Sequence, residues 1–301
     1  MLTYIFRQIF TWPVGWPIMR WLTANSTSRK QGAGIVYPER IVTLAAEIPA
    51  IIYELGALHR VVGISGYTTA PEEALVLPKV SGFRSASIDR IMRQKPDLAI
   101  LTSNVQQDLA VKLGQAGVTI LHLNPHRLTD LFDTVTLLGG ILGETVRAEQ
   151  LNQKLHEAFA QVKQSGEKLP WHPRVYFEEW MDPPICGTGW VSDLIEIAGG
   201  IDVFREKSVE GRTASLRQLT ASEIVTANVD IVLASWCGKP FDPETFNERV
   251  GSSRMSAIKT HSVFELDGNI LQCGPGLVQA AHAVHNILSE HVAIFPSPQM
   301  Q

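Results

Sequence analysis

The chain has 301 residues, of which 45% are hydrophobic and 19% charged, and its net charge is -4. The length predicts two lobes of ordinary size, and the hydrophobic content is too high for the chain to be a disordered tail. The negative net charge argues against a general nucleic-acid-binding protein. The sequence has no uninterrupted apolar run of about 20 residues, the length that a membrane span needs.

The first 37 residues differ in composition from the rest of the chain. They contain no acidic residue, and they hold four cationic residues and three of the seven tryptophans: Arg7, Arg20, Arg29, Lys30, Trp12, Trp16 and Trp21. Proline and glycine interrupt the apolar stretch and no Ala-x-Ala cleavage site follows it, which disfavours an ordinary signal peptide. Residues 1–22 could instead contact an anionic membrane surface as a basic arm. We favour a third interpretation, a disordered leader or an extension from a misassigned start.

Beyond this leader, short apolar segments alternate with amphipathic ones. Four segments are short, apolar and rich in β-branched residues, and are therefore predicted strands: residues 40–44, 61–64, 97–101 and 119–123. Helices are predicted from Pro49, over residues 87–91 and over residues 107–117. Strands that alternate with helices in this way predict a parallel sheet covered on both faces.

The same order recurs in the second half of the chain. Strands are predicted over residues 174–177 and 230–233, and helices over residues 192–198 and 220–224. Ile41 corresponds to Val175 at an offset of 134 residues, and Asp97 corresponds to Asp230 at an offset of 133. Two anchors at nearly one offset indicate two similar lobes.

A helical connector separates the two halves. Residues 129–142 and 145–165 both have helical periodicity, and the second helix would be about 32 Å long. We therefore predict an α/β protein in which two similar lobes, each with a central parallel sheet, are joined by a long rigid helix, with a ligand cleft between the lobes. The predicted divisions are a leader (1–37), an N-terminal lobe (38–125), the connector (126–168), a C-terminal lobe (169–295) and a tail (296–301).

Four stretches of the sequence resemble the substrate-binding proteins of ABC importers for vitamin B12 and ferric siderophores. They are residues 40–44 with the following helix, 80–98, 183–201 and 263–276, and together they span about residues 38–294. The similarity is greatest to B12-binding forms that carry the segment Glu178-Glu-Trp-Met-Asp-Pro-Pro. The resemblance implies two α/β lobes on a rigid helical backbone, a corrinoid such as cobalamin as the ligand, and no intrinsic cofactor.

The resemblance also implies which side chains face the ligand. Tyr67 and Phe83 lie where the family places aromatic rings against a corrin, and flat rings suit a wide, flat macrocycle. Three further candidates, Trp180, Ile185 and Trp190, lie in a segment rich in Pro and Gly, read as a loop, and Trp236 follows a predicted strand. The alternative for each aromatic residue is packing on its own lobe.

Polar candidates lie near the C-terminal end of the resemblance. Asp267 and Gln272 fall near two polar ligand contacts of B12 binders, with Gln272 where an arginine is expected. The alternative for Asp267 is ordinary turn chemistry in Asp-Gly-Asn. The family has a tryptophan in the second lobe that is not evident in this sequence, and Leu216 lies near that position.

Two acids are candidates for docking to a transporter permease. Asp89 occupies the position that the family uses in the first lobe, and Glu223 lies one residue from the corresponding position in the second. An acid at a helix start is equally explained by the helix dipole.

Three Cys-Gly dipeptides begin at Cys186, Cys237 and Cys273, and we place all three in second-lobe loops after strands. Their spacing matches no compact metal motif, so small buried residues are a better interpretation than thiolate ligands, and no metal site is predicted. An odd number of cysteines forms no complete disulfide framework, and together with the absent cleavage site this slightly favours the cytoplasm. The periplasm is the alternative, if the leader is an atypical signal.

No catalytic motif is present in the sequence. We therefore predict a non-catalytic, monomeric protein that binds a corrinoid or a related metal chelate, as the binding component of an ABC importer. The alternative hypothesis is an intracellular cofactor-handling protein or enzyme on the same fold that uses cleft cysteines.

Overall fold

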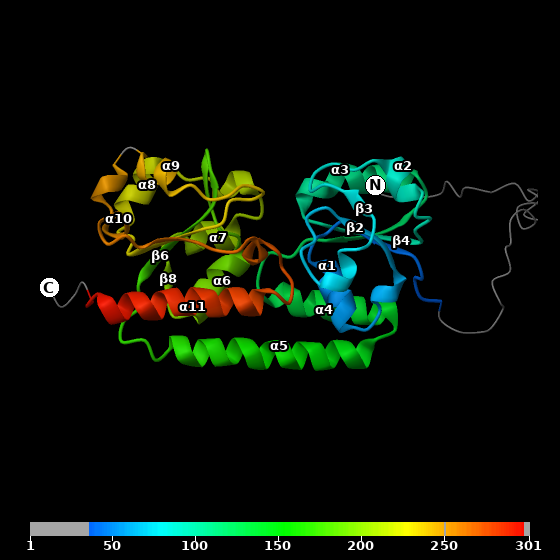
Figure 1. Ribbon diagram of the computed structural model, residues 1–301, viewed down its shortest axis with the longest axis horizontal. Helices are drawn as coiled ribbons and strands as arrows, with labels where there is room; N and C mark the ends of the chain where they lie inside the picture. The colour runs from blue at the N-terminus through cyan, green and yellow to red at the C-terminus, as the bar shows by residue number, and fades with distance from the viewer. Residues whose placement is uncertain (1–35, 250, 298–301) are drawn as a thin grey trace, which may run out of the picture. The chain divides into compact units, whose positions relative to one another are not determined.

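The computed structural model describes residues 36–249 and 251–297, so the predicted leader and the end of the tail lie outside the described residues. From Tyr37 on, the described chain packs as one compact unit with two α/β lobes (Figure 1). Within the described ranges, no helix is both long and apolar enough to cross a bilayer.

The first lobe contains a five-stranded, wholly parallel sheet. Its spatial order is β3-β2-β1-β4-β5. The strands are β1 (Ile41–Thr43), β2 (Val61–Ser65), β3 (Lys79–Ser81), β4 (Leu98–Thr102) and β5 (Thr119–Leu123). The helices around it are α1 (Ile48–Glu54), α2 (Ile88–Met92) and α3 (Gln107–Gln115). The four predicted strands are present, whereas β3 was not predicted because its three residues are too few to show a periodicity.

The second lobe repeats this plan with one antiparallel strand. Its sheet has the order β10-β9-β6-β7, and β8 pairs with β6. The strands are β6 (Arg174–Met181), β7 (Pro184–Cys186), β8 (Ile201–Asp202), β9 (Ile231–Ala234) and β10 (Val263–Glu265). Strand β7 runs antiparallel to β6, because only two residues connect them and a parallel crossover needs a dozen or more. The loop predicted around Trp180 is therefore a β-hairpin.

Short helices complete the second lobe. They are α6 (Gly189–Ile197), α7 (Arg205–Glu210), α8 (Ala221–Thr226), α9 (Pro243–Asn247) and α10 (Ser256–Lys259). Single 3₁₀ turns occur in both lobes: η1 (Leu58–Arg60), η2 (Glu72–Ala74), η3 (Asn104–Gln106), η4 (Ala214–Arg217), η5 (Ser252–Arg254) and η6 (Gly268–Leu271).

The predicted internal repeat is visible as the same polar arrangement in each lobe. The amide of Arg40 donates to Asp97 at 3.0 Å, and the amide of Arg174 donates to Asp230 at 2.8 Å. Each guanidinium also donates to backbone carbonyl groups just after the short helix that precedes its aspartate. The offset found in the sequence therefore marks equivalent positions at the starts of β1 and β6.

Two helices connect the lobes and a third returns along them. α4 (Thr129–Leu142) and α5 (Thr145–Gly166) lie where helices were predicted, and α11 (Leu277–Ile294) packs against α5 and α6 (Figure 1). The apolar face of α5 lies in one continuous core that includes Ile51 of the first lobe and Phe177 of the second. Two smaller clusters, one in each lobe, cover the other faces of the sheets. A shared core of this kind makes the connection rigid.

Candidate functional site

Two aromatic side chains of the first lobe lie together at the exits of neighbouring strands. Tyr67 follows β2 and Phe83 follows β3, and their ring centroids are 6.0 Å apart in an edge-to-face arrangement. The side chain of Tyr67 is 48% exposed and that of Phe83 is half-buried. An exposed aromatic pair is a surface that a flat apolar ligand can cover.

The loop after β9 brings the second lobe close to this aromatic pair. A Cβ atom placed on Gly238 would lie 3.8 Å from the ring and hydroxyl of Tyr67. The next residue, Lys239, holds its ammonium 5.2 Å from the ring centroid of Trp180 in the β6–β7 hairpin. Tyr67 of the first lobe therefore lies near the second-lobe loop that carries Lys239, and Lys239 in turn contacts Trp180.

Trp180 and Ile185 face each other across the β6–β7 hairpin. They are register partners, and Trp180 is half-buried with its indole N–H donating to the carbonyl of Asp182 at 2.9 Å. Ile185 is buried. Of the second-lobe aromatic candidates, Trp180 is therefore the one with an accessible face.

The other two tryptophan candidates are buried and hydrogen-bonded. The indole N–H of Trp190, in α6, donates to the carbonyl of Ile270 at 2.9 Å. The indole N–H of Trp236 donates to the carboxylate of Glu178 at 2.9 Å, and the Trp236 ring packs edge-to-face on Phe241 with centroids 4.9 Å apart. Both arrangements correspond to the packing alternative. Leu216, at the position of the missing family tryptophan, is 62% exposed.

The polar candidates lie where the two lobes meet. The side-chain amide of Gln272 donates to the backbone carbonyl of Tyr67 at 3.4 Å. Asp267 is exposed and accepts from the amide of Asn269 at 2.8 Å, as a turn residue does. The hydroxyl of Thr69 donates to the side-chain oxygen of Asn269 at 2.9 Å. The segment at residues 267–272 therefore contacts the loop that carries Tyr67.

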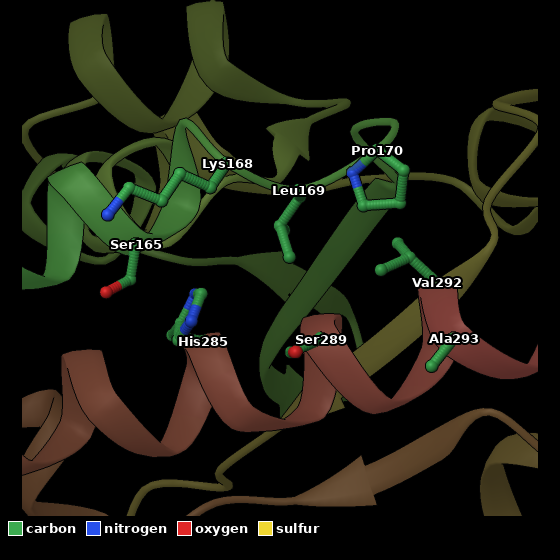
Figure 2. A pocket seen from close by; sticks show the side chains of 8 residues that line it. All are labelled: Ser165, Lys168, Leu169, Pro170, His285, Ser289, Val292 and Ala293. Carbon is green, nitrogen blue, oxygen red and sulfur yellow. The ribbon is translucent and has the colours of Figure 1, made fainter.

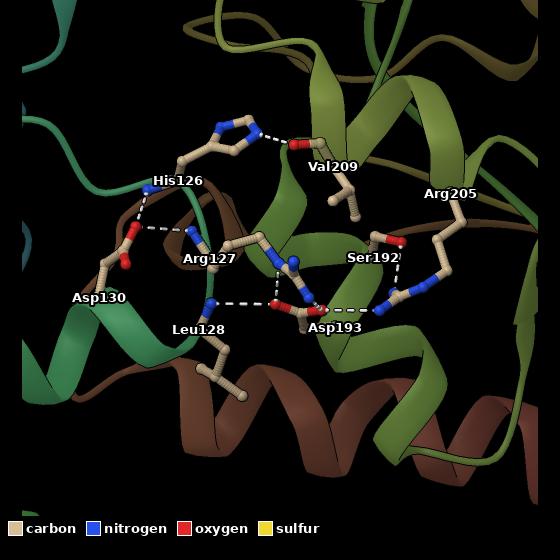
Figure 3. A network of polar contacts seen from close by, with 8 residues as sticks. All are labelled: His126, Arg127, Leu128, Asp130, Ser192, Asp193, Arg205 and Val209. Atoms are coloured by element: carbon tan, nitrogen blue, oxygen red, sulfur yellow. Dashed lines mark hydrogen bonds and ion pairs between the residues drawn. The ribbon is translucent and has the colours of Figure 1, made fainter.

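A second polar contact between the lobes begins directly after β5 (Figure 3). Arg127 donates to Asp193 of α6 through two nitrogens, at 2.8 and 2.6 Å, and Arg205 of α7 donates to the same carboxylate at 3.2 Å. His126 places a ring nitrogen 2.7 Å from the carbonyl of Val209, and burial lowers the pKa of this histidine. This cluster fixes the start of the connector against the second lobe.

Glu47 is a buried acid at the meeting of the lobes. Glu47 follows β1. A Cβ atom added to Gly274 of the second lobe would lie 3.0 Å from the Cβ atom of Glu47. Burial raises the pKa of Glu47, although a hydrogen bond from its own backbone and one from Thr102 oppose the shift. Its neutral form is therefore favoured relative to a free glutamate.

The three cysteines are separate and unpaired. Cys186 lies within β7 and Cys273 after η6, both buried, whereas Cys237 follows β9 and is exposed. The prediction that all three lie in loops was wrong for Cys186, because the hairpin extends the strand structure to that residue. Burial raises the pKa of the Cys186 thiol to about 11, and it raises the pKa of Cys273 well above its ordinary value. Within the part of the chain that is described, no three His, Cys, Asp or Glu residues are grouped to hold a metal ion.

The two docking candidates differ in their surroundings. Asp89 lies in the first turn of α2 and is exposed. Glu223 forms a capping box with Thr220 at the start of α8 and a 2.9 Å ion pair with Lys207. The hydrogen bond from Lys207, followed by those from Thr220, lowers the pKa of Glu223 to about 2. The Glu223 carboxylate is thus already paired, and that of Asp89 lies in solvent.

Two cavities lie away from the aromatic pair. One, of about 300 Å³, lies at the C-terminal ends of α5 and α11 and contains none of the predicted site residues (Figure 2). The other, of about 520 Å³, lies between the lobes under α1 and η6, and Asp267 lines it together with Tyr53 and Pro71.

Two arginine–glutamate pairs around the hairpin were not foreseen from the sequence. Glu178 pairs with Arg249, and Glu179 pairs with Arg217. The only signal in the sequence is two adjacent acids within an apolar strand, since a buried acid requires a partner. The partners are 71 and 38 residues away, a distance at which no local pattern identifies them.

Known proteins with similar sequences include components of ABC transporters and vitamin B12-binding proteins. An uncharacterized ABC transporter substrate-binding lipoprotein of Bacillus subtilis, YvrC, is 24% identical over 249 residues, which is 80% of this chain and 77% of that protein. The vitamin B12-binding protein of Vibrio cholerae is 28% identical over 192 residues, 62% of this chain and 68% of the relative.

Solved structures show the same fold. The apo form of the periplasmic heme-binding protein RhuT from Roseiflexus sp. RS-1 has a TM-score of 0.72 and 22% identity, with 84% of this chain and 98% of that chain covered. The periplasmic vitamin B12-binding protein BtuF of Vibrio cholerae has a TM-score of 0.67 and 22% identity, at the same coverage of both chains. At this level of identity the likeness concerns the fold alone.

The periplasmic binding protein family matches residues 41–270. Its members are binding proteins and not enzymes. The family therefore supports the prediction of a non-catalytic protein, and it gives no support to the alternative of an enzyme. The family and the lipoprotein relative also conflict with the cytoplasmic location that the cysteines and the leader favoured. Because the match covers about three quarters of its length, the chain belongs to the periplasmic binding protein family.

Proposed function

We propose that this protein is the binding component of an ABC importer and that its ligand is a corrinoid such as cobalamin. The observation that carries the proposal is the exposed pair Tyr67 and Phe83, which lies opposite Gly238 and, through Lys239, next to Trp180. Relatives named for vitamin B12 support a corrinoid over other solutes. The role requires export from the cytoplasm and a permease partner, for which Asp89 is the free acid of the two candidates.

The contact between the lobes sets a mechanical condition on binding. Tyr67 and the loop at Gly238 approach each other closely, since a Cβ atom added to Gly238 would lie 3.8 Å from the Tyr67 ring, so a flat ligand that enters between them must separate the two loops further. The shared core and the Arg127–Asp193 cluster restrict movement of the lobes as wholes. We therefore expect the loops at residues 66–71 and 236–240 to move while the lobes stay in place.

Heme is the second candidate ligand, and two exposed cations favour it. Arg84 directly follows Phe83, and Lys239 lies over Trp180. Cations at the edge of an aromatic surface suit the two carboxylates of heme better than the neutral amides of cobalamin. RhuT, one of the structural neighbours, is named as a heme-binding protein.

A titration against three classes of chelate tests the proposal. Purified protein is titrated with cyanocobalamin, hemin and a ferric hydroxamate siderophore by isothermal calorimetry. We expect cyanocobalamin to bind with a dissociation constant at or below about 1 μM, or about -8 kcal/mol. Tight binding of hemin alone would replace the corrinoid with the second candidate, and binding of the siderophore alone would refute both.

A further inference from the structure

Two adjacent acids precede the half-buried tryptophan of the β6–β7 hairpin. Glu178 and Glu179 are consecutive residues of β6, at the point where its pairing with β7 shifts register. Trp180 follows directly, and the turn to β7 begins after Met181. Groups that hold both acids therefore hold the base of the hairpin.

The carboxylate of Glu178 is fully buried and receives four hydrogen bonds from three side chains. The hydroxyl of Tyr176 donates to it at 2.8 Å, the indole of Trp236 at 2.9 Å, and Arg249 through two nitrogens. The same guanidinium donates to the carbonyl of Met181 at 2.9 Å. Arg249 thus joins both the strand and the turn of the hairpin to the loop after α9.

The second acid, Glu179, has a separate partner, Arg217 of η4. The side chain of Arg217 is 6% exposed, and its guanidinium also donates to the carbonyl of Cys186 in β7 at 2.6 Å. The backbone carbonyl of Glu179 accepts from the backbone amide of Cys237 at 3.2 Å. Arg217 therefore connects the two strands of the hairpin, and Glu179 connects the hairpin to the loop that contains Gly238.

The polar contacts of the Trp180 side chain are local or involve a flexible partner. Its indole hydrogen bond is local, to Asp182, and its other polar contact is the flexible side chain of Lys239. A buried ion pair often adds little stability relative to apolar residues of the same volume, so two such pairs at the base of one hairpin call for a role in geometry. Both pairs bond to the hairpin strands that carry Trp180.

We propose that Glu178 with Arg249 and Glu179 with Arg217 are positioning residues that hold Trp180 in place before the ligand binds. The inference rests on the proposed function for its effect on binding. A preorganised ring lowers the entropy that is lost in the complex, so loosening the hairpin should mainly increase the rate of dissociation.

Fluorine NMR of protein labelled with 5-fluorotryptophan tests the positioning without any ligand. A Trp180→Phe variant identifies the Trp180 resonance, and the resonances of Trp171 and Trp190 report on the rest of the fold. In Arg217→Met we expect the Trp180 resonance to shift and broaden while those of Trp171 and Trp190 keep their positions. The matched control is Arg174→Met, which removes an arginine from the opposite end of the same strand, where it donates only to backbone carbonyls.

Dissociation of whichever chelate the wild-type protein binds is then measured by stopped flow. We expect Arg217→Met to dissociate about tenfold faster or more, and Arg174→Met at the wild-type rate. If Arg217→Met does not fold, Arg217→Lys, which keeps the charge and loses the paired hydrogen bonds, is used in its place. An unchanged Trp180 resonance, or equal changes in all three tryptophans, overturns the positioning role. Failure of the wild-type protein to bind any chelate refutes the proposed function and leaves the NMR result to decide the positioning.

Discussion

The contact between the start of the connector and the second lobe provides a direct test of how the lobes are held. Asp193 accepts four hydrogen bonds, two from Arg127, one from the Leu128 amide at 3.1 Å and one from Arg205 (Figure 3). In Asp193→Asn the side chain keeps its shape but loses its charge. Its NH₂ group then faces the N–H donors of Arg127, Leu128 or Arg205 and cannot accept hydrogen bonds from them. We expect this variant to be less stable than the wild type.

The expected loss follows from the exposure of the pair. The side chain of Asp193 is 12% exposed and that of Arg127 is 35% exposed. Exposed pairs contribute up to about 1 kcal/mol, and breaking fully buried ones costs about 3–5 kcal/mol. A partly buried pair lies between these limits, so the free energy of unfolding should fall by about 2 kcal/mol.

The loss should also depend on pH. Burial acts to raise the pKa of Asp193, but the hydrogen bonds from Arg127 and Leu128 and the charges of both arginines lower it overall. A carboxylate with a lowered pKa stabilises the fold fully above its ordinary value of 3.8, and this contribution disappears as the pH falls through the lowered pKa.

Urea denaturation of the wild type and the variant, at about pH 7 and about pH 3, measures both effects. The control is Glu167→Gln, which removes the charge from a pair with Lys163 whose side chains are 64% and 62% exposed, and which should cost less than about 0.5 kcal/mol. Equal losses in the two variants, or a loss for Asp193→Asn that is the same at both pH values, would refute the reasoning.

Three further predictions concern single residues. Iodoacetamide should label Cys237 in the native protein at least about tenfold faster than Cys186 or Cys273, as peptide mass spectrometry would show, because only Cys237 is exposed. Gly189→Ala should lower the free energy of unfolding by about 1–3 kcal/mol, since its Cβ would lie 2.5 Å from the carbonyl of His126. Gly140→Ala, with open space around the added carbon, should be neutral or stabilising in the same urea assay. Glu223→Gln should cost less than about 1 kcal/mol above pH 4.5, and the cost should vanish as the pH falls towards about 2, because the pKa of Glu223 is lowered. A constant cost in acid urea titrations would contradict this assignment.

Local periodicity was sufficient to predict most of the fold. Residues 119–123 and 129–142 form a strand and a helix with the predicted bounds, because apolar spacing and turn residues determine such elements locally. The predicted repeat corresponds to the same contact in each lobe, Arg40 with Asp97 and Arg174 with Asp230. The antiparallel β7 was missed, because a two-residue turn between a strand and a proline-rich segment resembles a loop in the sequence.

The site was less accessible to sequence reasoning. A tryptophan within or just after a strand has the same sequence surroundings whether its side chain is accessible or buried. Trp180 is half-buried, whereas Trp236 is buried. Burial depends on what packs against the residue, and for Trp236 this is Glu178, 58 residues away. Tertiary packing of this kind has no local signature, so sequence reasoning proposed the set of aromatic residues and the structure ranked them by exposure.

The central claim is that a flat metal chelate binds on Tyr67 and Phe83. The most direct measurement is the dissociation constant of the chelate for the wild type and for a Tyr67→Ala, Phe83→Ala double variant. The matched control is Leu137→Ala, which removes an apolar side chain of similar exposure, 43% against 48%, from α4, away from both cavities. We predict that the double variant binds at least about 30-fold more weakly, from about 1 kcal/mol or more for each lost ring, and that the control binds like the wild type. Equal affinity in all three proteins would contradict the account.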